Sequence, residues 1–308
     1  MVIKGAGTVI KVSPSCEVQI RFHMPPLELR RYLTTFYIAE WKLPDGELLV
    51  DHLMPEWANL RFHSGSLPEA VTQAGMRLAD TSFAATGPSS ESVRFTVGPS
   101  RMWGIGLLPL GWAKFVRAPA AELANAAVDG FAHPAFASFV PLGRTIFAQG
   151  PDPLGELDRI TRHFLARIDE PVPDLDGITA IHRALVDPET TTVARLLETS
   201  GISQRAVERI CRRAFGFSPK VLLRRQRFMR SLSHFMLDPS LRWIGAMDGH
   251  YHDQAQFVRD FRQFMGMTPR QYAALPKPLI GEVMRERARF LASPVQALDN
   301  PGGPIARA

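Results

Sequence analysis

The residues from Thr192 to Tyr272 contain one local pattern twice, fifty positions apart. The capping, apolar, basic and turn residues of the two copies coincide: Ser203 with Asp253, Val207 with Phe257, Arg209 with Arg259, Arg212 with Arg262, Gly216 with Gly266, and Pro219 with Pro269. Phe-Gly-Phe-Ser-Pro at 215–219 likewise corresponds to Met-Gly-Met-Thr-Pro at 265–269. A match at a fixed period indicates a duplicated supersecondary unit.

Each copy predicts a helix, a turn and a second helix. In the first copy Gly201 supplies the turn, and Ser203 is a suitable N-cap for a helix that extends to about Phe215. Gly216 ends that helix, and Pro219 begins the next one, where its missing N–H costs nothing. The corresponding residues of the second copy are Asp253, Gly266 and Pro269. The two copies should be joined by a continuous helix over Pro219–Leu237, about 28 Å long.

The region from about 180 to 275 resembles the double helix-turn-helix domain of the AraC/XylS family of bacterial transcription regulators. Three runs carry the resemblance: Gly-Ile-Ser-Gln-Arg-Ala-Val-Glu-Arg from 201, Arg-Arg-Gln-Arg-Phe-Met-Arg-Ser-Leu from 224, and Asp-Gln-Ala-Gln-Phe-Val-Arg-Asp-Phe-Arg-Gln-Phe-Met-Gly-Met-Thr-Pro-Arg-Gln-Tyr from 253. One position departs from the family pattern: His250 occupies a position in the second turn at which members of the family usually have glycine. Either the second turn is reshaped, or His250 takes a positive backbone angle.

The resemblance implies that the helices Ser203–Phe215 and Asp253–Met265 enter adjacent major-groove segments of double-stranded DNA. The base-contacting positions carried over from the family are Arg205, Glu208, Arg209, Gln254, Gln256 and Arg259. We further expect contacts to phosphate, or a structural role beside the backbone, for Ser203, Arg212, Lys220, Arg224, Arg225 and Arg262. Arg227 can instead tie the two copies together.

The distribution of charge agrees with this interpretation. Residues 181–275 hold fifteen Lys and Arg against eight Asp and Glu, a net charge of +7, whereas the whole chain carries +6. The rest of the chain therefore sums to about −1, which argues against a nonspecific DNA binder with basic charge spread along its length. Within 204–230, nine basic residues stand against one acid, as expected of a surface that meets phosphate.

The first 170 residues contain many short strand-like segments separated by turns, which predict a small β-barrel or sandwich without fixing its strand order. In the family, this region is commonly a cupin-like barrel that binds an effector or mediates dimerisation, and Gly104–Ala113 resembles the end of such a domain. We expect helices near 118–128 and 154–168; the second could pair two subunits or pack on its own barrel. His23, His52 and His63 could line a pocket, or be surface or satisfied residues.

The predicted fold class is therefore α+β, with a β-rich domain over 1–170, a linker over 171–180, the helical DNA-binding domain over 181–275, and a helical to frayed tail over 276–308. Trp41, Trp57, Trp103 and Trp112 are interpreted as core, although the interior of a barrel can also hold a ligand. Cys16 and Cys211 fall in different domains, so a structural disulfide is not expected.

The sequence lacks a secretory signal and an apolar run long enough for a membrane span, so we expect a cytoplasmic protein that does not contact a membrane. We find no enzyme motif, no metal-ligand spacing and no cofactor motif. The favoured hypothesis is a sequence-specific transcription regulator, with DNA, a small-molecule effector, RNA polymerase and a second copy of the chain as partners. The alternative is a small-molecule-binding protein or enzyme with a degenerate DNA-binding domain.

Overall fold

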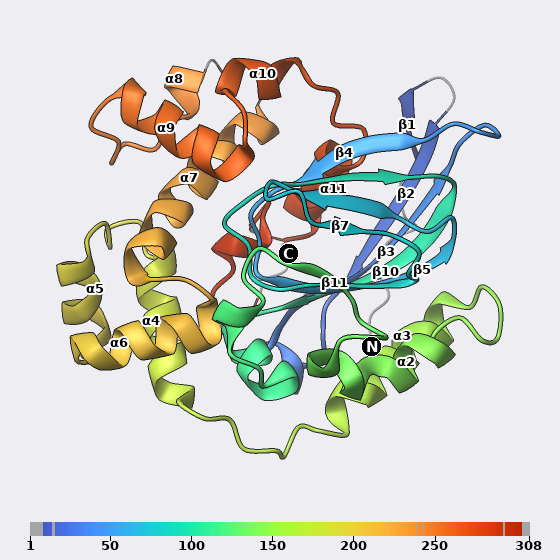
Figure 1. The fold of residues 1–308 in the computed structure, drawn as a ribbon, viewed down its shortest axis with the longest axis horizontal. Coiled ribbons are helices and arrows are strands. Elements are labelled where there is room, and N and C mark those ends of the chain that lie inside the picture. The colour runs from blue at the N-terminus through green and yellow to red at the C-terminus, as the bar shows by residue number, and fades with distance from the viewer. Residues whose placement is uncertain (1–8, 14–15, 239, 242, 292, 304–308) are drawn as a thin grey trace.

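The computed structural model describes residues 9–13, 16–238, 240–241, 243–291 and 293–303; the expectations for residues 1–8 and 304–308 lie outside these ranges. It has an N-terminal β-rich domain and a C-terminal helical region (Figure 1). The strands are β1 (Val9–Ser13), β2 (Cys16–His23), β3 (Leu33–Lys42), β4 (Leu49–Leu53), β5 (Ala58–Gly65), β6 (Glu69–Thr72), β7 (Arg77–Leu78), β8 (Phe83–Thr86), β9 (Val93–Val97), β10 (Ser100–Leu107) and β11 (Ala127–Asp129). The predicted α+β class is confirmed.

The strands form two antiparallel sheets. The larger has the order β1-β2-β3-β10-β5-β8-β11, and the smaller has the order β4-β9-β6-β7. Because side chains alternate along a strand, each strand of the larger sheet has an inner and an outer face. On β5, Asn59, Arg61 and His63 point to the space between the sheets, whereas Leu60 and Phe62 belong to the core on the other side.

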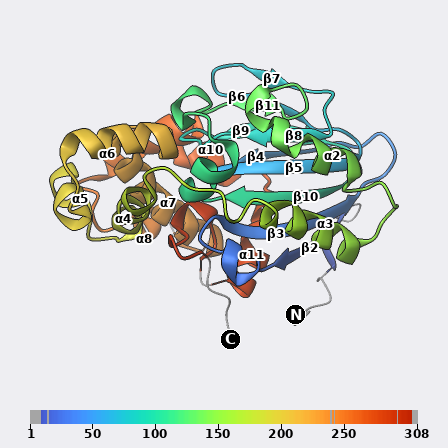
Figure 2. The ribbon, with the colours of Figure 1, turned by 90° about the horizontal axis from the view of Figure 1, so that it is seen from below.

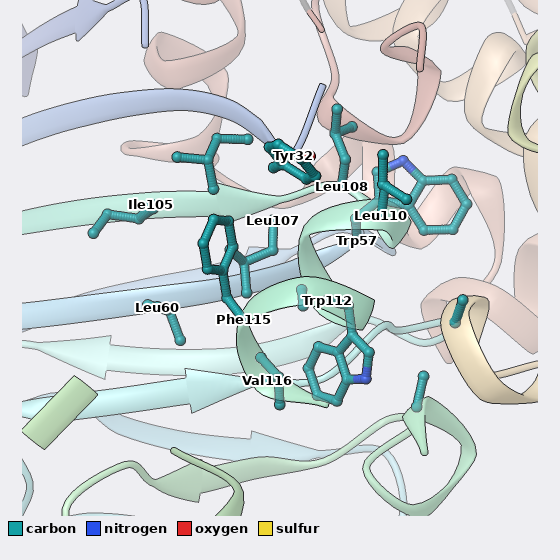
Figure 3. Close-up of a cluster of buried hydrophobic side chains, with 14 of the residues drawn as sticks. Tyr32, Trp57, Leu60, Ile105, Leu107, Leu108, Leu110, Trp112, Phe115 and Val116 are labelled. Atoms are coloured by element: carbon teal, nitrogen blue, oxygen red, sulfur yellow. The ribbon is translucent and has the colours of Figure 1, made fainter. Parts of the chain in front are cut away.

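Helices cover the outer face of the larger sheet (Figure 2). The helical elements of this region are α1 (Pro109–Gly111), η2 (Trp112–Val116), η3 (Ala120–Glu122), η4 (Pro134–Phe139), α2 (Val140–Thr145) and α3 (Pro153–Leu165), and the short turn η1 (Leu27–Leu29) precedes β3. Phe115 of η2 lies beside Leu107 of β10 and near Leu60 of β5 (Figure 3), and Trp112 of η2 belongs to the same hydrophobic cluster. This packing buries one face of the sheet and leaves the inner face to line a cavity.

Helix α3 packs on its own domain rather than standing free for a second subunit. Its residues Glu156, Ile160 and Phe164 are buried. The carboxylate of Glu156 accepts hydrogen bonds from Arg101 at 2.5 and 2.6 Å and from Trp103 Nε1 at 2.6 Å. Because a buried carboxylate is costly unless it is paired and hydrogen-bonded, these contacts fix the helix on the sheet.

The segment over 118–128 is not the expected helix. It contains the single turn η3 and then strand β11, which pairs with β8. Gly87 N also donates to the carbonyl of Ala126, so backbone pairing with the sheet edge prevails over the local helix preference. The expected linker also ends sooner, because helix α4 already begins at Leu175.

The helical region comprises α4 (Leu175–Val186), α5 (Val193–Ser200), α6 (Gln204–Ile210), η5 (Cys211–Phe215), α7 (Pro219–Leu237), α8 (Trp243–Ala246), α9 (Gln254–Met265), α10 (Pro269–Ala274), α11 (Ile280–Phe290) and η6 (Gln296–Leu298). Its side chains share hydrophobic clusters with the β-domain, so the two regions do not have separate cores. In the described ranges, no helix combines the length and apolar character that crossing a membrane requires.

The C-terminal segment is packed where the sequence suggests a frayed end. Helix α11 is capped by Asp51 of β4, whose carboxylate accepts from Leu279 N and Ile280 N at 2.9 and 2.8 Å. Beyond it, Val295 and Ala297 are buried, and Gln226 of α7 donates to the carbonyl of Ala297. The described part of this end, residues 293–303, thereby joins the linker helix to the β-domain.

We predict that Glu156→Ala lowers the free energy of unfolding by about 3 kcal/mol, because it removes the buried carboxylate that pairs with Arg101 and accepts from Trp103, and leaves Arg101 only the more exposed Glu40. The control is Asp158→Ala on the same helix, which breaks the exposed pair with Arg162 and should change stability by less than about 1 kcal/mol. Denaturant titration followed by circular dichroism measures both variants. Equal losses would contradict the assigned role of Glu156.

Candidate nucleic-acid interface and its junction with the β-domain

The first helix-turn-helix unit has the predicted order of elements. Thr192 caps α5 by accepting a hydrogen bond from Arg195 N at 3.1 Å, and Gly201 ends it at φ 67°. Helix α6 continues into the π-helical turn η5, which Gly216 ends at φ 85°. Ser203 occupies the N-cap position of α6, although its side chain makes no capping hydrogen bond.

The second unit repeats this plan with a shorter first helix. Asp253 caps α9 by accepting from Gln256 N at 2.6 Å, and Gly266 ends the helix at φ 73°. The turn between α8 and α9 is reshaped, because His250 does not have a positive φ. Instead, the Asp248 carboxylate accepts from His250 N at 2.9 Å and from Arg230 Nε at 2.5 Å, so this acid holds the turn.

The structure exposes most of the side chains that the sequence assigns to DNA. The exposed residues are Ser203, Arg205, Glu208, Arg209, Arg212, Lys220, Gln254, Arg259 and Arg262, and Gln256 is half-buried. Two of the carried-over base contacts already have partners. Arg209 forms hydrogen bonds of 2.6 and 2.9 Å with Asp174, ahead of α4, and Glu208 accepts from Gln204 at 3.0 Å.

A basic groove lies between the two units along α7. Four cations at helical spacing contribute to its wall: Lys220, Arg224, Arg227 and Arg230. Thr192 at the start of α5 and Gln256 of α9 also line the groove, so it extends from the first unit to the second. Its volume is about 300 Å³. Arg230 and Thr192 are not among the residues predicted to contact DNA, although the spacing of three and four along α7 is visible in the sequence.

Two of these arginines also fasten α9 to α7. Asp260 is buried on the inner side of α9 and accepts from Arg224 Nη2 at 2.5 Å and from Arg227 Nη2 at 3.1 Å. The hydroxyl of Tyr251 donates to the same carboxylate at 3.2 Å. Arg227 therefore fastens the linker helix to the second copy, and Arg224 shares this structural role while it remains part of the groove.

Arg225 is not a phosphate contact, because its side chain is completely buried at the junction with the β-domain. Its guanidinium lies 3.8 Å from the ring centroid of Trp57 and donates to the carbonyls of Ser89 at 2.9 Å and Glu56 at 3.3 Å. No carboxylate is bonded to it among the described residues, and burial lowers the pKa of Arg225 to about 9. The guanidinium is thus held by stacking and by carbonyl dipoles.

The second unit has its own contacts with the β-domain, at the end of α9. Ser92 N donates to the carbonyl of Phe264 at 2.8 Å, and Ser92 Oγ donates to that of Met265 at 3.0 Å. Gln73 Nε2 also donates to the Phe264 carbonyl, at 3.0 Å. Because the last carbonyls of a helix have no intrahelical partner, these backbone and side-chain donors satisfy the end of α9.

A cavity of about 150 Å³ lies inside the β-domain, and part of its wall comes from the helical region. The inner faces of both sheets contribute side chains such as Trp41, Phe95 and Met102. Met229 contributes from the middle of α7, and Met284 contributes from α11. His63 lines this cavity, in agreement with one of the two expectations for it, whereas His23 and His52 are absent from the wall.

Comparison with known families gives two matches. Residues 196–274 match a helix-turn-helix domain family, and residues 21–129 match a domain family of unknown function, DUF6597. No curated protein matches the chain. Residues 196–274 are therefore a helix-turn-helix domain, and together with the two units described above they are of the AraC type, a DNA-binding domain of transcription regulators.

Among solved structures, the chain is similar to the apo form of a lysine-to-alanine variant of ToxT from Vibrio cholerae strain SCE256, with 10% identity, 86% of this chain and 98% of that chain covered, and a TM-score of 0.40. It is also similar to ToxT from the same strain bound to an unsaturated fatty acid, with 10% identity, coverage of 87% and 98%, and a TM-score of 0.37. The AraC-like transcriptional activator CuxR has 9% identity, coverage of 70% and 81%, and a TM-score of 0.33.

Proposed function

We propose that the chain is a sequence-specific transcription regulator whose β-domain binds a small molecule and thereby controls DNA binding. Helices α6 and α9 read bases in two adjacent major-groove segments, and the basic groove on α7 follows the phosphate backbone between them. RNA polymerase and a second copy of the chain are further partners in this proposal. The number of copies on DNA can be measured by sedimentation of the complex.

The observation that carries the control step is the cavity wall shared by the β-domain and α7. Met229 lines the cavity from the middle of the helix that joins the two units. A ligand in the cavity would therefore touch the element that sets the separation of the two reading helices. A molecule can shift a conformational equilibrium only by interacting differently with its two states, and this contact provides such an interaction.

A second connection runs from the cavity to α7 through Glu56. Its side chain lines the cavity and is paired with Arg61 at 2.7 Å, while its carbonyl accepts from Arg225. Ser89 Oγ accepts from Glu56 N at 3.0 Å, and the Ser89 carbonyl binds Arg225 as well. A displacement of the Glu56 side chain by a ligand would thus act on the backbone that holds α7.

We predict that Arg205→Ala weakens binding to the cognate site by about 1–3 kcal/mol and relaxes the preference at one base position, because arginine contacts guanine through two hydrogen bonds. Arg195→Ala on α5 removes the same charge from an exposed pair away from the reading helices, and it should preserve the preference. Fluorescence-anisotropy titrations with cognate and scrambled duplexes measure both. Equal weakening by Arg205→Ala on all sequences would reject its role as a base contact.

Arg212 and Lys220 are exposed and are proposed to contact phosphate. Arg212→Ala should lower affinity equally on cognate and scrambled DNA and reduce the dependence of binding on salt by about one unit of slope, because one fewer counterion is released. Titrations at four or five salt concentrations measure this slope. An unchanged slope would remove Arg212 from the phosphate contacts.

The proposed control by the cavity can be tested without knowing the ligand. Ala39→Phe fills space in the cavity wall, and we expect it to change cognate DNA affinity by at least about fivefold, the lower end of typical allosteric coupling. Leu48→Phe adds the same group at the exposed Leu48 of the β-domain and should have no such effect. Ala70→Phe, at a half-buried lining position, serves if Ala39→Phe does not fold.

The full chain is the appropriate material for these measurements, because the β-domain and the helical region share their hydrophobic clusters. If folded Ala39→Phe and Ala70→Phe both bind DNA like the unaltered chain, the control step of the proposed function is wrong. The proposed reading of bases by α6 is tested separately, by Arg205→Ala.

A further inference from the structure

The charged groups in the cavity wall, Glu56, Arg61 and Arg287, each have a partner of opposite charge. Arg61 makes two hydrogen bonds with the Glu56 carboxylate, at 2.7 and 2.9 Å, and one with Thr86 Oγ1 at 3.2 Å. Arg287 is bonded to Asp299 at 2.5 Å, and its other terminal nitrogen donates to the carbonyl of Ser293. Among the described residues, the wall therefore presents neither a free cation for an anionic ligand nor a free carboxylate for a cationic one.

His63 provides one directional contact in this wall. Its side chain is buried, and Nδ1 has no hydrogen-bond partner in the described part of the chain. Burial, together with the neighbouring Arg61, lowers the pKa of His63 to about 3, so the imidazole is neutral at physiological pH. A buried polar atom without a partner is rare, and a ligand atom or a water would satisfy it.

The size and the remaining chemistry of the cavity point to a small aromatic or aliphatic molecule. The volume of about 150 Å³ is comparable to that of a buried protein cavity that binds benzene. Aromatic side chains, including Trp41 and Phe95, line it together with several methionines. Methionine adapts its shape and makes favourable contacts with aromatic rings.

We infer that the cavity binds an uncharged, largely apolar molecule about one aromatic ring in size, whose single polar group is met by His63. The inference rests on the proposed role of the β-domain as a sensor, and it adds the class of ligand. It excludes organic acids and amines as cavity ligands, because either would bury a charge beside groups that are already neutralised. The ligand would touch Met229 of α7 and residues of α11 at the same time.

The test uses three matched compounds and calorimetric titration of the full chain at pH 7. p-Cresol is neutral and carries one hydroxyl, toluene lacks the hydroxyl, and p-toluate replaces it with a carboxylate. We expect p-cresol to bind about three- to tenfold more tightly than toluene, the effect of one hydrogen bond, and p-toluate not to bind measurably. Ala39→Phe should abolish binding of p-cresol and toluene.

His63→Phe should remove the difference between p-cresol and toluene while toluene still binds. This readout separates the hydrogen bond from a general effect on folding. Absence of p-cresol binding overturns the inference, and so does p-toluate binding that Ala39→Phe abolishes. The second outcome would refute only the ligand class, whereas unchanged DNA binding by both filled-cavity variants would refute the sensor function itself.

Discussion

The stacking of Arg225 on Trp57 is the interaction on which the relation between the two regions depends. A buried guanidinium without a carboxylate is costly, and here the indole face and the carbonyls of Ser89 and Glu56 offset only part of the cost, because Nε and Nη2 have no hydrogen-bond partner among the described residues. These acceptors belong to β-domain segments next to the cavity, whereas Arg225 belongs to the helix that joins both reading units. Arg225 therefore ties α7 to two backbone segments of the β-domain, and one of them, at Glu56, also lines the cavity.

Other contacts attach each helix-turn-helix unit to the β-domain. The first unit shares a hydrophobic cluster with the helices that cover the larger sheet, and the second is attached through Ser92 and Gln73 at the end of α9. The Asp260 carboxylate, in turn, joins α9 to α7. These contacts hold both units on the β-domain, and in the proposed function they would carry a change at the β-domain to both units.

The sequence predicts the structure correctly where neighbouring residues determine it. The Gly201, Gly216 and Gly266 turns, the Asp253 cap and the uninterrupted stretch of α7 are local signals, and all were predicted correctly. Strand order depends on pairings between distant residues, such as β3 with β10, so repeated turns did not reveal it. The C-terminal segment around Val295 and Ala297 was expected to be frayed for the same reason, because the residues that bury it lie far away in the chain. The charge of the segment does not distinguish Arg225 from its neighbours, but helical phase does: Lys220, Arg224 and Arg227 lie on one face of α7, and Arg225 lies off that face and is buried.

The central claim, that the cavity wall and the linker helix are coupled through Arg225, is tested most directly by a double-mutant cycle on cognate DNA binding with Ala39→Phe and Arg225→Met. The account predicts that the two effects are not additive, with an interaction free energy above about 0.5 kcal/mol, because filling the cavity acts through the contact that the second variant removes. Additive effects, within about 0.3 kcal/mol, in folded single and double variants would contradict it.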